Sequence, residues 1–346
     1  MTNKKDIRSL TADELREYFL SIGQAKYRAD QVYQWLWQKA AHSFEDMSNL
    51  SKELRGTLEE HFMFHELSVH TRQKSTDGTI KYAFKLSDGN MVEGVLIPTA
   101  KRLTACISTQ VGCSLACEFC ATGKLKRMRN LAYSEIYDQV AVINEEAKAE
   151  HGKGLTNIVY MGMGEPLLNY KNTMESVAKI TQEEGLHMAA KRITISTAGI
   201  AKQIKQMGDD GSRVKLALSL HAANDEKRNS IMAINESNNL EVLAEALNYY
   251  YTKTQQAVTF EYIIFKDFND SIDDAKDLLN FCRKVPSKVN IIEYNDVEGT
   301  PFKKADQDKV DAFAAYLEDR GVIAKVRRSR GKDIDAACGQ LANKEG

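Results

Sequence analysis

The feature that most constrains the fold is a regular alternation of strand-like and helical stretches after residue 100. Successive strand-like stretches are separated by helical ones, and such strand–helix units predict a parallel sheet covered by helices. About six units suit an incomplete (β/α) barrel, and a doubly wound open sheet is the alternative. The apolar, strand-like runs are 103–109, 155–161, 192–197, 214–220, 257–264, 288–293 and 322–328, and the stretches with helical spacing are 134–150, 170–184, 200–207, 240–254, 272–284 and 305–319.

Polar residues and glycines mark several of the expected helix ends. Ser134 and Ser271 stand where the first free backbone N–H groups of a helix need a side-chain acceptor. Glycines follow helix ends, where a left-handed residue commonly stops the helix. These glycines are Gly152, Gly185, Gly208 and Gly321.

The first 98 residues follow two other patterns. Residues 1–65 predict helices, because Thr11 and Glu14 form a capping box and Ser51 can cap a helix that runs to about residue 62. Residues 66–98 alternate with a period of two in three runs separated by turn residues, which predicts an antiparallel β-ribbon. The expected division is therefore a helical domain over 1–65, a β-ribbon linker over 66–98 and a (β/α) domain over 99–346.

Charge and composition exclude some classes of protein. The 47 Lys and Arg residues against 48 Asp and Glu residues argue against a protein that coats nucleic acid through charge alone. We find no secretory leader, and no apolar run approaches the ~20 residues that span a bilayer. A cytoplasmic, reducing location is therefore expected, in which six cysteines do not form a disulfide framework.

Three of these cysteines stand close together just after the first strand of the predicted sheet. Cys113, Cys117 and Cys120 have the spacing C-x3-C-x2-C. Structural zinc usually has four protein ligands, whereas a 4Fe–4S cluster held by three thiolates keeps one iron open for another ligand. The spacing favours an iron–sulfur site, and a zinc site or inert thiols are the alternatives.

Polar residues and glycines also follow other predicted strands. In (β/α) barrels, the carboxyl ends of the strands form the rim on which chemistry occurs. Each residue also has a structural explanation, as a turn, a helix cap or a satisfied core histidine, but together they predict a binding rim. These residues are Gly164, Glu165, Ser196, Ser219, Leu220, His221 and Asn295.

Three further residues have ordinary explanations when the sequence pattern is considered alone. The position of Cys106 within the first strand predicts a buried thiol. The position of Cys338 near the C-terminus predicts an adventitious thiol on a mobile tail. Glu93 predicts a solvated residue of the β-ribbon.

Four segments together resemble the RlmN family of radical S-adenosylmethionine enzymes, and the similarity extends along essentially the whole chain. The family consists of dual-specificity methyltransferases that modify carbon 2 of adenosine in 23S rRNA and in tRNA. The resemblance implies a partial (β/α)6 radical SAM barrel with a small N-terminal helical domain and a β-ribbon. The matching segments are 112–120, 121–123, 162–166 and 333–341.

The resemblance also implies a role for each candidate residue. Cys113, Cys117 and Cys120 match the ligands of the 4Fe–4S cluster, and two S-adenosylmethionine molecules are used per turnover. Cys338 matches the cysteine that carries the methyl group. Cys106 matches the resolving cysteine, which releases the product as a disulfide forms between the two cysteines.

Further positions match the proton acceptor and the cofactor site of the family. Glu93 matches the proton acceptor. Gly164, Glu165, Ser196, Ser219, Leu220, His221 and Asn295 match the S-adenosylmethionine-binding positions. The family commonly has proline after this asparagine, whereas Asp296 follows Asn295 here.

The resemblance implies partners as well. The expected substrates are 23S rRNA near the peptidyl transferase centre and tRNAs with an adenosine 3′ of the anticodon. The basic runs 124–129 and 325–332 flank the proposed chemistry and suit RNA phosphates. An electron donor such as flavodoxin or ferredoxin, a cellular thiol reductant and a monomeric enzyme are also expected.

The sequence leaves two alternatives to this function. A Cfr-type enzyme, which methylates carbon 8 of an rRNA adenosine, shares both extra cysteines, but Pro166 favours the carbon-2 family because the rival typically has alanine there. A non-catalytic RNA-binding module with structural zinc is the alternative from another class.

Overall fold

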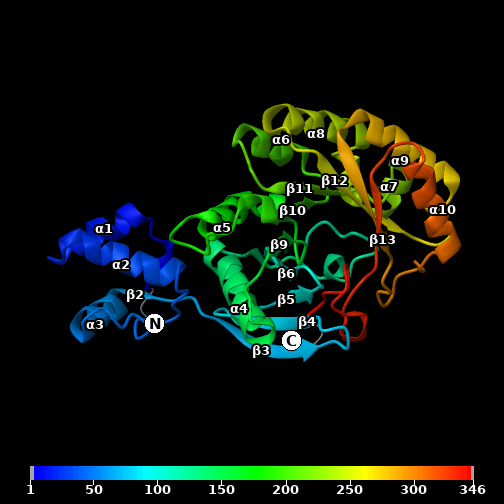
Figure 1. The fold of residues 1–346 in the computed structure, drawn as a ribbon. Coiled ribbons are helices and arrows are strands. Elements are labelled where there is room, and N and C mark those ends of the chain that lie inside the picture. Colours follow the sequence, from blue (N-terminus) through cyan, green and yellow to red (C-terminus); the bar gives the residue numbers. More distant parts are fainter. Residues whose placement is uncertain (1–3, 344–346) are drawn as a thin grey trace.

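The computed structural model describes residues 4–343. Figure 1 shows a small group of N-terminal helices beside a large α/β body, with α4 and α5 nearest to those helices. Within the described residues, no helix is long and apolar enough to cross a membrane.

The N-terminal region is helical, as the sequence predicts. Its helices are α1 (Ala12–Ser21), α2 (Lys26–Trp37) and α3 (Lys52–His61). Thr11 and Glu14 form the expected capping box, and the hydroxyl of Ser51 accepts from the backbone N–H of Leu54. A two-stranded parallel sheet joins β1 (Lys5–Asp6) to β2 (Phe62–Met63), so the ends of the region lie together.

Two buried cations fix this region to the large body. The guanidinium of Arg8 bonds both carboxylate oxygens of Asp138 on α4, with its Nη1 2.5 Å from Oδ1. On α5, Nζ of Lys179 donates to the hydroxyl of Tyr33 at 2.7 Å. Because a buried charge is stable only when it is paired and hydrogen-bonded, these contacts hold the two parts in one arrangement.

The large body is built on one ten-stranded sheet, in the order β14-β13-β12-β11-β10-β9-β6-β5-β4-β3. The strands from β6 to β14 are parallel, and the edge strands β14 and β3 do not pair with each other in the described chain, so the sheet is open. This arrangement confirms the predicted α/β class. The parallel strands are β6 (Leu103–Cys106), β9 (Asn157–Tyr160), β10 (Ile193–Thr197), β11 (Lys215–Ser219), β12 (Val258–Ile264), β13 (Ser287–Glu293) and β14 (Ala324–Arg327).

The predicted β-ribbon forms the other side of the same sheet. Strands β3 (Leu67–Lys74), β4 (Ile80–Leu86) and β5 (Met91–Pro98) are antiparallel, and β5 pairs with β6 in antiparallel register. The ribbon therefore extends the main sheet and places the residues of β5 beside the first parallel strand.

Helices connect the parallel strands in the expected order, with differences at three places. The structure adds α7 (Asp225–Ile231), which the sequence did not predict. Ser134 lies inside α4, because the carboxylate of Glu135 bonds the N-cap residue Ala132. Gly208 lies inside α6, where an added Cβ would lie 3.3 Å from Cα of Tyr250. The other connecting helices are α4 (Tyr133–His151), α5 (Tyr170–Thr181), α6 (Ala201–Asp209), α8 (Leu240–Thr254), α9 (Ile272–Lys284) and α10 (Gln307–Glu318).

Candidate active site

The cysteine loop, residues 112–120, leaves the sheet after β6 and is closed at its base by a short hairpin. Strands β7 (Gln110–Val111) and β8 (Arg129–Asn130) pair in antiparallel register on either side of it. Gly112 has φ +72°, and an added Cβ would lie 2.3 Å from the carbonyl oxygen of Lys126. Only glycine therefore lets the two sides of the loop approach this closely.

The three thiols of the loop lie close enough to influence one another. Burial, followed by the charges of Cys120 and Glu165, raises the pKa of Cys113 to about 11. Burial also raises the pKa of Cys117, followed by the charges of Cys120 and Cys113. Thiols that repel each other as thiolates need a positive centre between them before they can all ionise.

Backbone N–H groups surround these sulfur atoms. The N–H groups of Leu115 and Ser114 favour the thiolate of Cys113, and those of Gly123 and Thr122 favour the thiolate of Cys120. Hydrogen bonds to cysteine sulfur are one of the means by which proteins tune iron–sulfur clusters.

Two thiols of the cysteine loop border an apolar core. Within residues 4–343, no three Cys, His, Asp or Glu side chains converge on a point where they could hold one metal ion. Cys117 and Cys120 instead border an apolar core made by Phe119, Ala198, Ala222, Ile231, Met232, Ile263, Phe265 and Tyr294.

His221 is a neutral core residue at the end of β11. Its backbone has φ +56°, and its Nδ1 accepts from the backbone N–H of Ile263 at 3.1 Å. Burial, followed by the charge of Arg228, lowers the pKa of His221 to about 3. The ring of Phe119 meets the imidazole edge-on at 4.8 Å, which links the cysteine loop to β11.

Glu165 connects the turns after β9 and β10. Its Oε1 accepts from the backbone N–H of Leu167 at 2.9 Å, and its Oε2 accepts from that of Ala198 at 2.8 Å. Burial raises the pKa of Glu165 to about 7. The preceding residue, Gly164, has φ +93°, and an added Cβ would lie 2.5 Å from Cβ of Gln110. Packing against Gln110 therefore explains why this position is glycine.

The structure brings the other predicted rim residues to the same edge of the sheet. The hydroxyl oxygens of Ser196 and Ser219 lie 3.4 Å apart on the neighbouring strands β10 and β11. Leu220 is buried, and its backbone N–H donates to the carbonyl of Glu261 at 3.0 Å. Asn295 follows β13 and is also buried, and its Oδ1 has no hydrogen-bond partner in the described chain.

The C-terminal segment, residues 335–343, lies across this rim and is held by it. The backbone N–H of Ala121 donates to the carbonyl of Gly339 at 2.8 Å, and the hydroxyl of Thr122 donates to the carbonyl of Leu341 at 2.7 Å. The Nδ2 of Asn295 donates to the carbonyl of Cys338 at 3.3 Å. The segment is therefore anchored next to the cysteine loop, and the expectation of a mobile tail at Cys338 is wrong.

This anchoring brings Cys338 and Cys106 together, although 232 positions separate them in the printed sequence. Cys106 is buried on β6, and burial followed by the charge of Cys338 raises its pKa. The side chain of Cys338 is exposed, yet the protein around it is dense enough to raise its pKa to about 11, with smaller effects from Glu261 and Cys120. An accessible thiol thus lies beside a buried one at the cysteine loop.

Glu93 is buried, so its interpretation as a solvated strand residue is wrong. It lies on β5 with 3% of its surface exposed. Its Oε2 accepts from the backbone N–H groups of Ala342 at 2.8 Å and Asn343 at 3.2 Å, and its Oε1 lies 3.5 Å from Nζ of Lys81. The C-terminal segment covers this carboxyl group, which is a contact between residues about 250 positions apart.

Two buried ionisable residues of the site were missed. Arg228 on α7 is fully buried and donates to the ends of β10 and β11. Glu261 on β12 is buried, which raises its pKa to about 7, and its Oε1 accepts from Nδ2 of Asn290 at 2.8 Å. The only signal of Glu261 was an acidic residue inside the apolar run 257–264.

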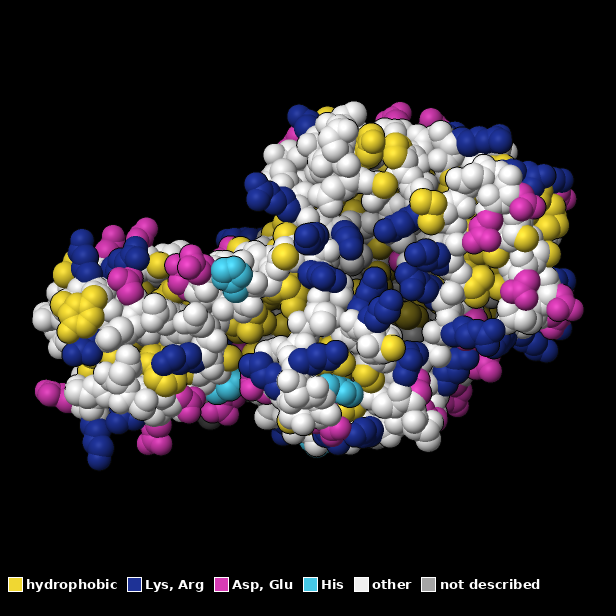
Figure 2. Space-filling model, viewed as in Figure 1, with side chains coloured by type: hydrophobic (Ala, Val, Ile, Leu, Met, Phe, Trp, Pro, Cys, Tyr) yellow, Lys and Arg dark blue, Asp and Glu magenta, His cyan; other side chains and the backbone are white. Residues whose placement is uncertain are grey.

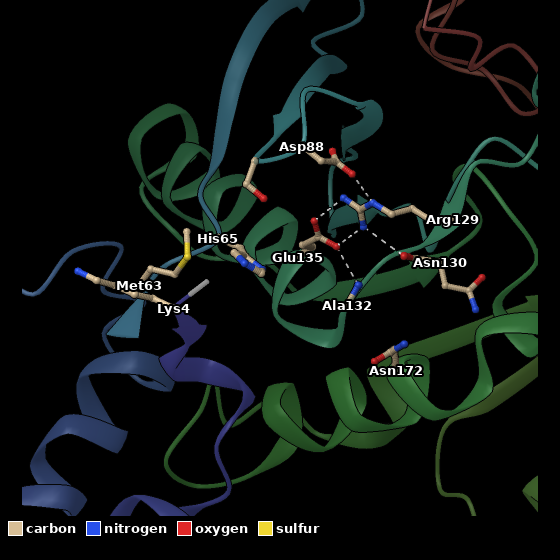
Figure 3. A pocket seen from close by; sticks show the side chains of 10 residues that line it. Lys4, Met63, His65, Asp88, Arg129, Asn130, Ala132, Glu135 and Asn172 are labelled. Atoms are coloured by element: carbon tan, nitrogen blue, oxygen red, sulfur yellow. Dashed lines mark hydrogen bonds and ion pairs between the residues drawn. The ribbon is translucent and has the colours of Figure 1, made fainter. Parts of the chain in front are cut away.

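One basic side chain that was expected to contact RNA is engaged elsewhere. Figure 3 shows Arg129 between Asp88 and Glu135 in a cavity of about 600 Å³ between the N-terminal region and the large body. The guanidinium lies 2.5 Å from Oδ2 of Asp88 and 2.7 Å from Oε2 of Glu135. A smaller cavity of about 220 Å³ lies between residues 121–125, which follow the cysteine loop, residues 296–298 and the C-terminal segment.

Most other members of the basic runs are exposed. Figure 2 shows Lys and Arg side chains gathered around a hollow on one face of the large body. The exposed cations of the two runs that make no ion pair in the described chain are Lys124, Lys126, Arg127, Lys325, Arg327 and Arg328.

The chain matches known proteins along almost its whole length. Residues 5–64 match the ribosomal RNA large subunit methyltransferase N-terminal domain, and residues 107–282 match the radical SAM superfamily. A protein of Cytophaga hutchinsonii named as a probable dual-specificity RNA methyltransferase RlmN is 57% identical, over 99% of this chain and 94% of its own.

A second relative and a solved structure agree with these matches. The dual-specificity RNA methyltransferase RlmN of Geobacter sulfurreducens is 43% identical, over 98% of this chain and 92% of its own. The crystal structure of a radical SAM methyltransferase from Sphaerobacter thermophilus superposes with a TM-score of 0.92 at 39% identity, covering 97% of this chain and 99% of that one. With the cysteine loop, the rim and two adjacent cysteines in place, this chain belongs to the RlmN family of the radical SAM superfamily.

Proposed function

We propose that this protein is an RNA methyltransferase that adds a methyl group to carbon 2 of an adenosine in 23S rRNA and in a subset of tRNAs. The observation that supports this most strongly is the position of Cys338, which is exposed beside the buried Cys106 and next to the cysteine loop. Carbon 2 of adenine is electron-poor, so methylation there requires chemistry other than direct displacement. Family membership supports the same reaction.

The residues present fit an iron–sulfur cluster and S-adenosylmethionine. Cys113, Cys117 and Cys120 would hold a 4Fe–4S cluster, with backbone N–H groups directed at two of the sulfur atoms. A bound cluster supplies the electron that cleaves S-adenosylmethionine to a 5′-deoxyadenosyl radical. The residues proposed to bind S-adenosylmethionine are Gly164, Glu165, Ser196, Ser219, Leu220, His221 and Asn295.

The remaining steps use the two cysteines. Cys338 would take the methyl group from one S-adenosylmethionine, losing its thiol proton and forming a thioether, and a second molecule is used in the same turnover. The methyl group on Cys338 would lose a hydrogen atom to the 5′-deoxyadenosyl radical, and its carbon would then join carbon 2 of adenine. After the adduct has given up one electron, the thiol of Cys106 would lose its proton and its sulfur would attack that of Cys338. The bond between the Cys338 sulfur and carbon then breaks and its electron pair stays on the carbon, which takes up a proton.

Two further groups complete the cycle. Glu93 would accept the proton lost from carbon 2, which requires the C-terminal segment to uncover its carboxyl group. The disulfide between Cys106 and Cys338 would be reduced by a cellular thiol. An electron donor such as flavodoxin or ferredoxin, a cytoplasmic location and a monomeric enzyme are part of the proposal.

RNA would approach over the C-terminal segment. The exposed cations Lys126, Arg127 and Arg328 belong to runs that adjoin the cysteine loop and the C-terminal segment, where they could contact phosphates. A structured RNA would present the target adenosine as an extruded base, because an adenine within a stack is inaccessible.

The test compares two cysteine variants after anaerobic purification. The wild-type protein should be brown, contain about four irons and form methylated RNA. Cys338→Ala should keep its iron and lose methyl transfer, whereas Cys282→Ala, on α9 outside the site, should keep both. Retained methylation in Cys338→Ala would exclude the proposed role of this cysteine.

The same preparation distinguishes the alternatives. Mass spectrometry of the nucleosides should find 2-methyladenosine, whereas 8-methyladenosine would indicate a Cfr-type enzyme. A colourless protein with about one zinc, and with RNA binding unchanged by Cys338→Ala, would indicate a non-catalytic zinc module.

A further inference from the structure

Arg228 on α7 is a fully buried cation that no part of the proposed reaction uses. Its guanidinium reaches the ends of two neighbouring strands. Nη2 donates to the carbonyls of Ala198 at 2.6 Å and Ser219 at 3.3 Å, and Nε donates to the carbonyl of Leu220 at 3.1 Å. One side chain thus fixes the backbone just after β10 and the last residues of β11.

These carbonyls belong to the segments proposed to bind S-adenosylmethionine. Ala198 follows the strand that ends with Ser196 and Thr197, and its N–H also donates to Glu165. Ser219 and Leu220 are themselves proposed cofactor residues. Arg228 therefore acts on the shape of this site through the backbone, without contributing an atom to it.

The hydrogen-bond acceptors of Arg228 in residues 4–343 are three backbone carbonyls and one amide oxygen, and none is a carboxylate. Its Nη1 donates to Oδ1 of Asn235 at 2.6 Å, and Nδ2 of Asn235 donates to Oδ1 of Asp225 at 2.8 Å. The nearest acidic group on its own helix is thus one amide away, and it also accepts from the backbone N–H of Leu240. A buried cation with only neutral hydrogen-bond partners is costly unless an anion lies close by.

The anion that the surroundings point to is the cysteine loop. The guanidinium of Arg228 lies close enough to the sulfur of Cys117 for opposite charges on the two groups to attract each other. The loop and α7 are also joined directly, because the backbone N–H of Glu118 donates to the carbonyl of Ile231 at 3.1 Å. Ile231 packs in the apolar core that borders Cys117.

We propose that Arg228 is a positioning residue of the S-adenosylmethionine site and the internal counter-charge of the thiolate-bound cluster. This inference rests on the proposed function. The guanidinium holds the ends of β10 and β11 in the shape that receives S-adenosylmethionine, and its charge stabilises the added electron of the reduced cluster.

The test separates the hydrogen bonds of Arg228 from its charge. Arg228→Met removes both, and Arg228→Lys keeps the charge but cannot reach four acceptors. Lys227→Met is the matched control, since this lysine is the preceding residue of α7 and pairs outside the site with Asp274 at 2.5 Å. Each reconstituted protein is measured for the midpoint potential of its cluster and for its affinity for S-adenosylmethionine.

The expected results differ between the variants. Arg228→Met should lose at least tenfold in the equilibrium constant for one-electron reduction, about 59 mV, and at least tenfold in affinity. Arg228→Lys should recover most of the potential but keep the loss of affinity. Unchanged potential and affinity in Arg228→Met, or an equal shift of potential in Lys227→Met, would overturn the proposal.

Two further measurements apply if Arg228→Met does not fold or if the wild-type chain binds no cluster. If Arg228→Met does not fold, wild-type affinity in Arg228→Lys refutes the positioning role. If the wild-type chain binds no cluster, the proposed function falls, but amide hydrogen exchange of the cluster-free chain still tests the backbone part. Arg228→Lys should then speed exchange at residues 198–199 and 220–221, and exchange equal to that of Lys227→Met would contradict it.

Discussion

Replacing Glu93 with alanine should release the C-terminal segment from β5. The carboxyl group accepts from two backbone N–H groups of this segment, at 2.8 and 3.2 Å. Hydrogen bonds to charged groups contribute about 1.5–3 kcal/mol each. Losing both should therefore weaken the local attachment by about 3 kcal/mol, which is roughly a hundredfold in the opening equilibrium.

Hydrogen exchange and thiol alkylation measure this opening. In the cluster-free protein, the amides of Ala342 and Asn343 should lose most of their protection in Glu93→Ala, and iodoacetamide should alkylate Cys338 faster. Glu93→Gln should show a smaller effect, because its amide oxygen can still accept but carries no charge.

The control is Glu118→Ala, which removes an exposed carboxylate from the cysteine loop and should leave the segment attached. If the amides of the C-terminal segment keep their protection within twofold in Glu93→Ala, then Glu93 does not hold the segment. The need to uncover its carboxyl group during the reaction would then have no basis.

Three further predictions concern stability. Arg8→Met should leave the buried carboxylate of Asp138 unpaired and lower the free energy of unfolding, measured by urea titration, by about 3–5 kcal/mol. The surface change Arg16→Met should lower it by about 1 kcal/mol or less. Equal losses in the two variants would contradict the role of the buried ion pair. Burial raises the pKa of Glu261 from near 4.5 to about 7. Between these two pH values the folded state keeps a proton that the unfolded state has lost. The free energy of unfolding should therefore fall by about 3 kcal/mol as the pH rises from 4.5 to 7. Glu261→Gln should flatten that slope, and an unchanged slope would refute the assignment. Gly164→Ala should lower the free energy of unfolding by about 3 kcal/mol, because the added Cβ meets Gln110 and the backbone is strained. Gly152→Ala, whose Cβ meets nothing within 4 Å, should lower it by only about 1–2 kcal/mol. Equal shifts in melting temperature would contradict the predicted clash at Gly164.

The parts of the fold that depend on local sequence were predictable. The capping boxes at Thr11 and Ser271 place helix starts within one residue, because their side chains bond backbone groups three positions away. The prediction of Ser134 as an N-cap was wrong, because the carboxylate of Glu135 accepts from the backbone of Ala132 and the helix begins at Tyr133. Helix α7 was missed because it is seven residues long and its most buried polar residue, Arg228, interrupts any apolar pattern.

The parts of the site that depend on distant contacts were less accessible. The spacing of the cysteine loop indicated a metal site because its ligands are local in sequence. The burial of Glu93 is set by a segment about 250 residues later, and the proximity of Cys106 to Cys338 depends on how that segment crosses the rim. A single sequence contains no pattern for such contacts, so only the family resemblance suggested them.

The most direct test of the two-cysteine mechanism is whether removing Cys106 traps the RNA on the protein. Cys106→Ala, reconstituted anaerobically and given substrate RNA, S-adenosylmethionine and a reductant, should accumulate a covalent protein–RNA species joined through Cys338 by one carbon. Peptide mass spectrometry after nuclease digestion should locate this bond. Release of methylated RNA at the wild-type rate, with no covalent species, would contradict the mechanism in which the two cysteines act together.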